Sequence, residues 1–437
     1  MESTLQHPLR IFAPHMEKTS IRGSLWIAFL VALIALGILA LIWQILFGHE
    51  VTGMRDNVVW GVYIVNFIFF MGISYAGALI SGTLHLFRTP WRKPVIRMAE
   101  FITIISLLIG PCFILLCIGR LDKLHYLVLF GRIQSPITWD VIAISTDLFG
   151  CFIFLYLAVL RDVARLRDSD LLRLPVWRKK LYKVLALGYT GTPEQQQRLN
   201  RATDIMAAMV IAIAIIVYSV LAWIFSVTLQ PGWHSTIFGP YFVIAAVYSG
   251  SAVLIVAMWL FRKIYHLEKY ITKKHFVSVG VIMLVLAAFF GYFTFSDYLT
   301  KWYGSEKNDE MLIRLLFSEF YWPFIISNYV GVLLPLIVVG IGKLRTITNI
   351  TLTAVVVIIA LWFNRYIIVV PTLEAPYLPI QDSRPEWISY SATWVEWSLT
   401  AAGVAVFLLL FTLASKFVPI IPISAVEAED KKEESPA

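Results

Sequence analysis

Ionisable residues lie within long apolar runs of this chain, where burying a charge is costly and usually serves a function. Asp140 and Asp147 lie in one such run, two helical turns apart, so they share a helix face that Cys151 extends. This spacing suggests a proton-transfer step. The structural alternatives are that Asp140 caps the helix and that a neighbouring Tyr or Ser holds Asp147.

A cation precedes this pair. Arg120 follows the preceding apolar run and is joined to Asp140 by a short link, so we expect the guanidinium and the carboxylate to face each other. The link contains "YLVLFGRI", which is apolar enough to lie flat and roof a cavity. At the other end of the preceding run, Glu100 is expected to pair with Arg97 or Arg92.

Further polar groups lie in the second half of the chain. We expect Arg365 to snorkel from the end of its apolar run, which would need no function. The others are Asp297, Asn328, Asn364 and Glu396.

The elements that position these residues are membrane-spanning helices. The chain is 59% hydrophobic and 15% charged, with a mean hydropathy of +0.76, which excludes a soluble protein of 437 residues. Apolar runs of about 20 residues are long enough to cross the hydrocarbon core of a bilayer. Ten can be marked, at 24–47, 58–87, 96–117, 139–160, 205–227, 237–261, 276–299, 322–341, 350–369 and 388–413.

The basic residues set the orientation. Ten spans put both termini on one side, and most of the 36 Lys and Arg lie on that side, so the positive-inside rule places both termini in the cytoplasm of a prokaryotic inner membrane. The pI near 9.2 therefore gives no argument for nucleic acid. The outer link "PGWHSTIFGPYF" has no Lys or Arg; Trp233, Phe238 and Tyr241 suit an interfacial aromatic belt, and His234 suits the surface.

No resident redox cofactor or nucleotide site is expected. The three cysteines form no C-x-x-C pattern, and the eight histidines lie at span ends or in links rather than facing each other within helices. These positions argue against an iron–sulfur cluster, a haem and a metal site in this chain. No Walker A sequence is present, so ATP-driven transport has no support.

Two small-residue strings suggest an internal repeat. "GALISGTLHLFR" ends the second span and "GSAVLIVAMWLFR" ends the sixth, which predicts two parallel four-helix bundles, although close helix packing alone would favour such strings. The predicted parts are a cytoplasmic segment 1–23, a peripheral helix 24–47, a first bundle 58–227, a second bundle 237–369, a last helix 388–413 and a disordered tail 425–437. The first bundle includes the link 161–201, where "VWRKKLYKVLAL" suits an interfacial helix or a solvated connector.

Several motifs together resemble the NrfD family, the membrane subunits of polysulfide reductase-like complexes. They are "GVYIVNFIFFMGISYAGALIS", Gly119-Arg120 followed by "SPITWD", "YKVLALGYTGT", the link beginning "PGWHS" and "WFNRYIIVVPTL". The ten-span form is most similar to the quinol-oxidising subunit of alternative complex III. The resemblance implies a quinone site near the outer face, no redox cofactor in this subunit and possible proton translocation.

The resemblance also implies roles for particular residues. Asp140 would accept a proton from quinol and Arg120 would hold Asp140 or a quinone oxygen. At position 117, where quinol-oxidising members commonly have His, this chain has Cys117, and His125 is a candidate replacement. Candidate pocket residues are Tyr63, Asn66, Tyr75, Cys117, Ser135 and Trp139, and the candidate proton path is Asp147, Tyr156 and Glu100.

Three functions stay open. The first is a quinone-reactive subunit that exchanges electrons with an extracytoplasmic iron–sulfur partner, alongside a cytochrome c or molybdenum-type subunit and a second membrane subunit. The second is a non-catalytic anchor or proton-path subunit, which Cys117 favours because a thiol in an apolar setting is a poor base. The third is a secondary transporter with helices broken at Gly110-Pro111 and Pro335.

Overall fold

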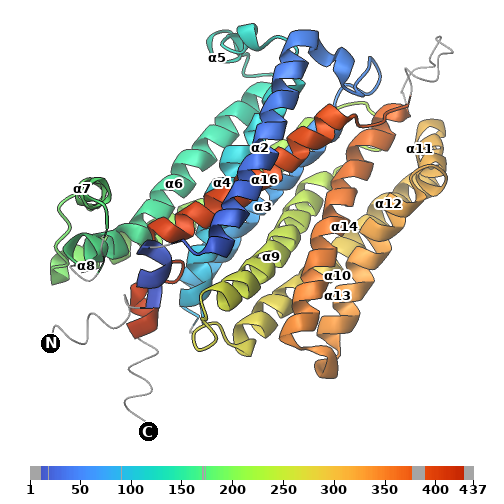
Figure 1. The fold of residues 1–437 in the computed structure, drawn as a ribbon. Coiled ribbons are helices and arrows are strands. Elements are labelled where there is room, and N and C mark those ends of the chain that lie inside the picture. The colour runs from blue at the N-terminus through green and yellow to red at the C-terminus, as the bar shows by residue number, and fades with distance from the viewer. Residues whose placement is uncertain are drawn as a thin grey trace.

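Ten long apolar helices form the protein. The computed structural model describes residues 11–17, 19–89, 91–169, 172, 174–375 and 389–427. Within these residues ten helices are long and apolar enough to cross a membrane, which confirms the prediction of a ten-span all-α membrane protein (Figure 1). They are α2 (Ile21–Phe47), α3 (Val62–Leu86), α4 (Lys93–Cys117), α6 (Pro136–Asp168), α8 (Pro193–Ser226), α9 (Phe238–Ile264), α10 (Lys273–Gly304), the segment Tyr321–Gly340, α14 (Ile347–Glu374) and α16 (Trp394–Phe417).

The span Tyr321–Gly340 is not a uniform α-helix. It consists of α12 (Tyr321–Ile325), a π-helical turn η3 (Ile326–Val330) and α13 (Gly331–Gly340). A π-helical turn inside a helix is uncommon and frequently marks a functional region. Here it turns Ser327 inward, where the side chain is buried and its hydroxyl donates to the Phe324 carbonyl.

Two helices extend well beyond their apolar cores. α6 continues to Asp168, and α8 begins at Pro193 rather than at 205, so both reach into the predicted link. The start of α8 has a local cause: Thr192 is its N-cap, accepting from the Gln195 amide at 3.3 Å, and Pro193 occupies the first helical position. The hydropathy pattern did not predict these extra helical turns because they contain charged residues.

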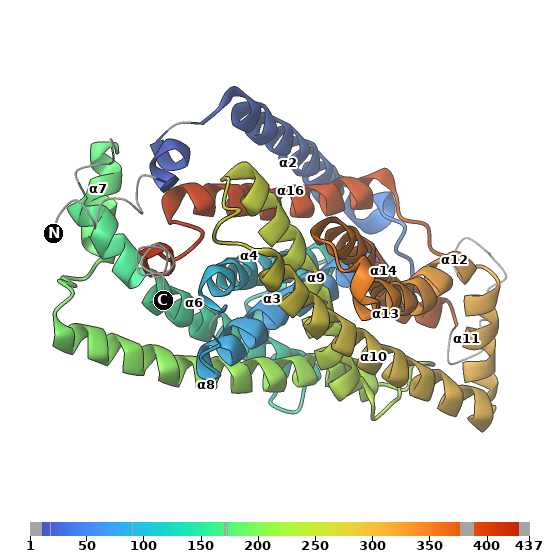
Figure 2. The ribbon, with the colours of Figure 1, turned by 90° about the horizontal axis from the view of Figure 1, so that it is seen from below.

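The helices pack as two rings of four with the same order. In the first ring α3 and α6 each pack against α4 and α8; in the second, α9 and α13 each pack against α10 and α14. The rings meet mainly where α3 crosses α9, near the centre of the molecule in Figure 2. α2 and α16 pack on each other outside the rings, and α16 also packs against α4 and α3.

The small-residue strings are places of close helix approach. A Cβ atom at Gly250 would lie 2.0 Å from the Cβ of Ala76, so α9 and α3 are nearly in backbone contact there. A Cβ at Gly77 would lie 2.3 Å from the Thr103 hydroxyl of α4. Both strings therefore serve packing between neighbouring helices.

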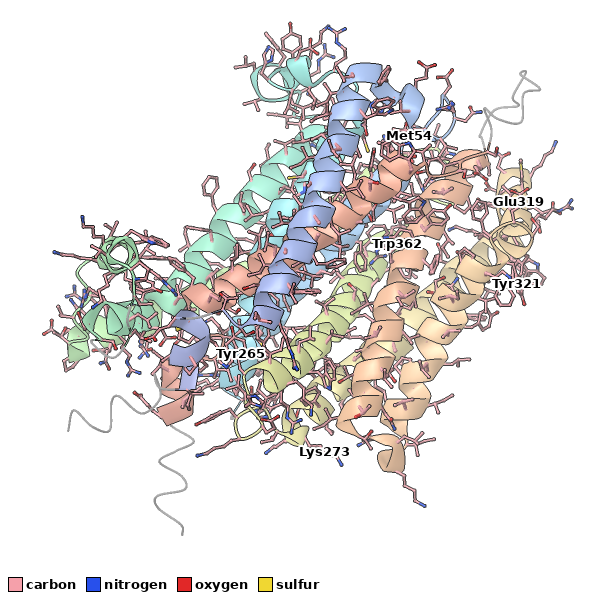
Figure 3. The ribbon with its side chains drawn as sticks, viewed as in Figure 1. Met54, Tyr265, Lys273, Glu319, Tyr321 and Trp362 are labelled. Carbon is pink, nitrogen blue, oxygen red and sulfur yellow. The ribbon has the colours of Figure 1, made fainter. Side chains whose placement is uncertain are left out.

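The molecule has two ends. Links 48–61, 118–135, 227–237 and 305–320 lie at one end, here called the α5 face after α5 (Tyr126–Leu129). The first and last described segments, 11–17 and 423–427, lie toward the other end, here called the terminal face. Figure 3 shows Met54 and Glu319 toward the α5 face and Tyr265 and Lys273 toward the terminal face.

Both ends of the chain are anchored on the terminal face. Phe12 is fully buried, and α7 (Val176–Leu185) is bound to the chain ends because Arg178 donates to the Met16 carbonyl at 3.1 Å and Tyr182 to the Phe417 carbonyl at 2.6 Å. The start of the predicted disordered tail, residues 425–427, is helical with Val426 buried. The tail from 428 and the segment 1–10 lie outside the described residues.

Candidate functional site

The predicted site residues fall into separate groups, and the first lies between α3 and the outer helices. The Tyr63 hydroxyl donates to the Gln44 side chain of α2 at 2.6 Å. The Asn66 amide donates to Thr400 of α16 at 2.8 Å and accepts from the Trp362 indole of α14 at 2.9 Å. Tyr63 and Asn66 thus point to the same side of α3, as their spacing predicts, and toward three other helices.

The end of α4 adds a thiol and an imidazole to this Tyr63 group. Cys117 is the last residue of α4 and lies within electrostatic range of Tyr63 and Glu396. His49, in η1 (Gly48–Val51), lies so near Gly119 that a Cβ there would be 3.8 Å from its Nε2. Its Nδ1 is buried without a hydrogen-bond partner among the described residues. His49 therefore places an imidazole beside Gly119, two residues after Cys117, which the sequence did not suggest.

A fully buried carboxylate closes this group toward the α5 face. Glu396 accepts from the Gly53 amide at 2.7 Å, the Thr393 amide at 2.9 Å and the Tyr390 hydroxyl at 2.6 Å. Tyr390 in turn accepts from the Val62 amide at 2.8 Å, so Glu396 ties α16 to the start of α3. Thr393 and Glu396 form a capping box, a pattern readable in the sequence as T-x-x-E.

The second group is a line of acidic residues on α6. Asp140 is 7% exposed and Asp147 is 0% exposed, on the inward face that their spacing predicts. The Cys151 thiol donates to Asp147 Oδ1 at 3.2 Å, while Asp140 Oδ1 and Asp147 Oδ2 are buried with no hydrogen-bond partner among the described residues. Ser135 is the N-cap of α6, so Asp140 is not a helix cap.

Two residues of neighbouring helices face this α6 line. The Tyr75 hydroxyl of α3 is buried, lacks a hydrogen-bond partner among the described residues, and lies within electrostatic range of Asp147 and Asp140. Glu100 of α4 lines a small cavity with Cys151, and Ala78, Ser81, Thr103 and Phe154 complete its wall. Tyr75, Asp140, Asp147 and Glu100 thus belong to one polar series inside the first ring.

The series ends near the terminal face in a buried ion-pair cluster. Arg97 binds Asp162 with an Nη1–Oδ2 distance of 2.9 Å, and its Nε lies 3.8 Å from Glu100 Oε2. The guanidinium also donates to the Ala158 carbonyl at 2.9 Å. Of the two partners expected for Glu100, Arg97 is the one observed.

The expected pairing of Arg120 with Asp140 is wrong. Arg120 pairs with Asp122 at 3.0 Å, with 68% of its side chain exposed, and this hydrogen bond lowers the pKa of Asp122. His125 is exposed and lies against the Tyr126 ring. The link 118–135 forms its own short turns beyond the ends of α4 and α6 (Figure 1), so its charges stay in solvent.

Three further predicted residues lie at the edges of the first ring. The Trp139 indole donates to the Ile133 carbonyl and so holds the link 118–135 against α6, whereas Ser135 occupies the N-cap position of α6 without a capping hydrogen bond from its side chain. The Tyr156 hydroxyl donates to the Leu185 carbonyl of α7 at 2.6 Å. Its observed contact is therefore with the α7 connection rather than with Asp147 or Glu100.

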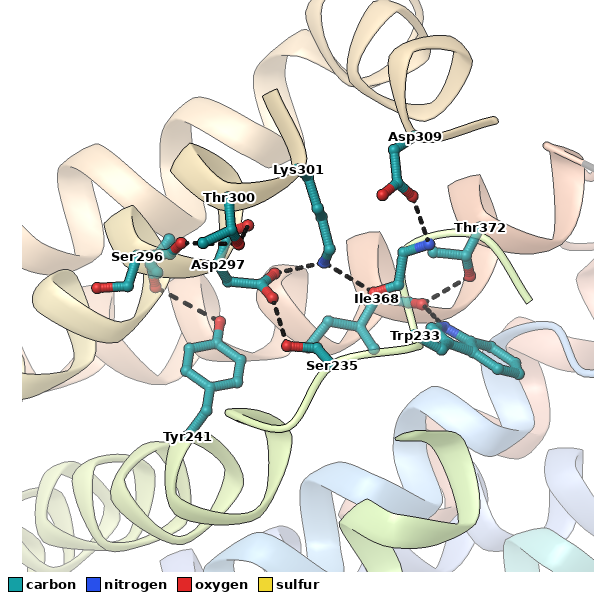
Figure 4. Close-up of polar contacts among 12 residues, drawn as sticks. Trp233, Ser235, Tyr241, Ser296, Asp297, Thr300, Lys301, Asp309, Ile368 and Thr372 are labelled. Carbon is teal, nitrogen blue, oxygen red and sulfur yellow. Dashed lines mark hydrogen bonds and ion pairs between the residues drawn. The ribbon is translucent and has the colours of Figure 1, made fainter. Parts of the chain in front are cut away.

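The second ring holds a polar cluster of its own (Figure 4). Lys301 binds Asp297 within α10 and donates to the Gly232 carbonyl at 2.8 Å, and Ser235 donates to Asp297 at 3.0 Å. The aromatic-belt expectation is wrong for this link: Trp233, Phe238 and Tyr241 are buried, with the Trp233 indole donating to the Ile368 carbonyl at 2.6 Å. His234 is exposed, as predicted.

Arg365 also departs from expectation. Its side chain is 1% exposed rather than snorkelling, donates to Asn364 at 3.0 Å and lies over the Phe242 ring at 5.1 Å. Asn364 donates to the Tyr241 hydroxyl at 2.9 Å. Over the ranges the structure describes, no cluster of three or more His, Cys, Asp or Glu residues is arranged to hold a metal ion.

Ten apolar helices with buried acidic residues between them define a multi-pass integral membrane protein. The chain belongs to the NrfD polysulphide reductase family, whose model matches residues 50–375. This assignment confirms the resemblance drawn from the motifs.

Three curated relatives are named as parts of oxidoreductases. A selenate reductase subunit of Mesobacillus selenatarsenatis is 22% identical over 403 residues, covering 88% of this chain and 91% of the relative. The Hdr-like menaquinol oxidoreductase integral membrane subunit of Archaeoglobus fulgidus is 23% identical, covering 94% and 97%. A putative dimethyl sulfoxide reductase membrane subunit of Halobacterium salinarum is 28% identical, covering 56% and 53%.

Proposed function

We propose that this chain is the quinone-reactive membrane subunit of a respiratory oxidoreductase and exchanges electrons between membrane quinol and an extracytoplasmic iron–sulfur subunit. The observation that carries the proposal is the pair of buried carboxylates on α6, each with an oxygen that has no partner among the described residues. The names of two relatives, a selenate reductase subunit and a menaquinol oxidoreductase subunit, support it. The α5 face is the outer face in this proposal, and both termini are cytoplasmic.

The residues around Tyr63 suit the head group of a quinone, which is a flat apolar ring that carries two oxygens. Tyr63, Asn66 and Trp362 bring hydroxyl, amide and indole groups together beside aromatic walls, and His49 brings a buried nitrogen with no hydrogen-bond partner among the described residues. Bound quinol would supply two electrons to the iron–sulfur partner and two protons to the protein. We assign the quinone head to the region between the Tyr63 group and Asp140, with Cys117 at its edge.

Asp140 is the proposed first proton acceptor. Its free oxygen can form an O–H bond with a quinol proton, and Asp147 lies two turns farther along the same helix face. The cavity beside Cys151 and Glu100 then leads toward Arg97 and Asp162 near the terminal face. The exposed Arg120 and His125 take no part in proton transfer in this proposal.

Asp140→Asn tests the assignment in the purified complex. The amide keeps the shape but cannot take the proton, so quinol-dependent reduction of the partner should fall by at least about tenfold. Asp122→Asn is the matched control, because Asp122 is exposed and pairs only with Arg120 among the contacts described, and its turnover should equal that of the wild type. Equal turnover in both variants would exclude Asp140 as the acceptor.

The second candidate is a non-catalytic role in the complex, which Cys117 favours. The thiol donates to the Phe113 carbonyl at 3.6 Å inside an apolar helix end, where it is a poor base. A fully assembled wild-type complex that binds no quinol analogue would support this candidate, whereas analogue binding that Tyr63→Phe weakens would support the quinone site.

A further inference from the structure

Arg365 is a buried cation of the second ring that has no acidic partner among the described residues. Arg365 of α14 is almost completely buried, and among the residues that the structure describes it forms no ion pair with a carboxylate. Its observed partners are the Asn364 amide oxygen and the Phe242 ring. An unpaired charge in a membrane interior is costly, so a compensating negative charge is expected within electrostatic reach.

Of the other largely buried cations, Arg178 donates to backbone carbonyls on the terminal face, and two have acidic partners. Arg97 binds Asp162 and Lys301 binds Asp297, so both of these charges are compensated by direct contact. Buried carboxylates without a cation among the described residues lie at the α5 face, where Glu374 and Glu396 accept from backbone amides, and on α6. Asp140 and Asp147 make no ion pair among the described residues, and each keeps one free oxygen.

Two tyrosines connect Arg365 to these carboxylates. The Tyr218 hydroxyl of α8 lies beside the guanidinium, and the Tyr218 and Tyr75 rings are in contact with centroids 4.8 Å apart. Tyr75 lies within electrostatic range of Asp147 and Asp140. Both hydroxyls are buried without a well-formed hydrogen bond to any described residue.

The fold makes room for this connection. A Cβ atom at Gly72 of α3 would lie 2.9 Å from the Tyr218 hydroxyl, so only glycine allows the hydroxyl to pass between α3 and α9. Cys151 donates to Asp147, and Tyr75 of α3 lies within electrostatic range of it, while Glu100 of α4 lies beyond Cys151 and beside Arg97. Arg97 is already compensated by Asp162 and Glu100, which leaves Arg365 as the uncompensated positive charge behind the tyrosines.

We propose that Arg365 is the fixed counter-charge of a proton-loading site formed by Asp147, Tyr75 and Tyr218 across the interface between the two rings. With Asp147 ionised the two charges balance; when an oxygen of Asp147 binds a proton, the interior gains one positive charge, which favours release of that proton. Arg365 of the second ring thus sets the proton affinity of Asp147 in the first ring. This proposal rests on the proposed function in one respect only, namely that the proton comes from quinol.

The test is an infrared titration of the full complex without quinol. The absorption of the protonated Asp147 carboxyl group is identified by its loss in Asp147→Asn. In Arg365→Gln its titration midpoint should move up by about one pH unit, a tenfold change in proton affinity, as expected for opposite charges beyond direct contact. Arg365→Lys should restore the midpoint, because it keeps the charge.

The control is Arg120→Gln, which removes an exposed cation and should leave the midpoint unchanged. Tyr218→Phe keeps the guanidinium and should shift the midpoint in the same direction by a smaller amount, so it decides the question if Arg365→Gln does not fold. An unshifted midpoint in the folded variants, or the same shift in Arg120→Gln, would overturn the proposal. Because quinol is absent, this result is independent of the Asp140→Asn turnover test.

Discussion

Gly250→Ala should weaken the contact between the two rings. The new Cβ would lie 2.0 Å from that of Ala76, whereas carbon atoms pack best at about 3.5–4.0 Å. α3 and α9 must therefore move apart by about 1.5–2 Å at their crossing. Overpacking of this kind costs about 1–3 kcal/mol, and the helix propensity of Ala returns at most about 1 kcal/mol. We expect a net loss of about 1–2 kcal/mol.

Thermal unfolding of the protein in detergent measures this loss. Gly304→Ala is the control, because a Cβ at Gly304 would meet no atom within 4 Å, and it should be neutral or slightly stabilising. Ala76→Gly combined with Gly250→Ala removes the clash, so the double variant should unfold at a higher temperature than Gly250→Ala alone. An unfolding midpoint of Gly250→Ala equal to or above the wild type would refute the close approach of α3 and α9.

Two further predictions concern buried charges. Arg97→Met leaves Asp162 without its buried cation and should cost about 3–5 kcal/mol, whereas Arg314→Met, which breaks an exposed pair, should cost at most about 1 kcal/mol in the same unfolding assay. Glu396→Gln replaces two acceptor oxygens by one, so a donor such as the Gly53 amide loses its partner at a cost of about 1–3 kcal/mol. Faster amide hydrogen exchange at the start of α16 would show that a hydrogen bond to Glu396 has been lost. Unchanged exchange would count against the hydrogen bonds described for Glu396.

Local patterns predicted the parts of the site that depend on one helix. The spacing of Asp140 and Asp147 puts both carboxylates on one face of α6, and that of Tyr63 and Asn66 puts both on one side of α3, because helical periodicity alone decides these relations. The hydrophobic runs likewise predicted all ten spans.

Relations between helices could not be predicted in this way. His49 looks like a residue at the end of a span. The Gln44 side chain of α2 donates to the Leu116 carbonyl of α4, and this contact between distant segments brings His49 beside Gly119. Arg365 looked like a snorkelling residue because its apolar run ends at 369. α14 continues to Glu374, which puts Arg365 about two and a half turns inside the helix and buries it.

The same small residues that join the two rings also make the proposed electrostatic link possible. Gly72 and Ala76 lie one turn apart on α3, where the first admits the Tyr218 hydroxyl and the second meets Gly250 of α9. Large side chains at these positions would separate the rings, and with them Arg365 from the tyrosines that face Asp147. The packing and the charge balance therefore depend on one surface of α3, so loosening that surface should alter the titration of Asp147 before it unfolds the protein.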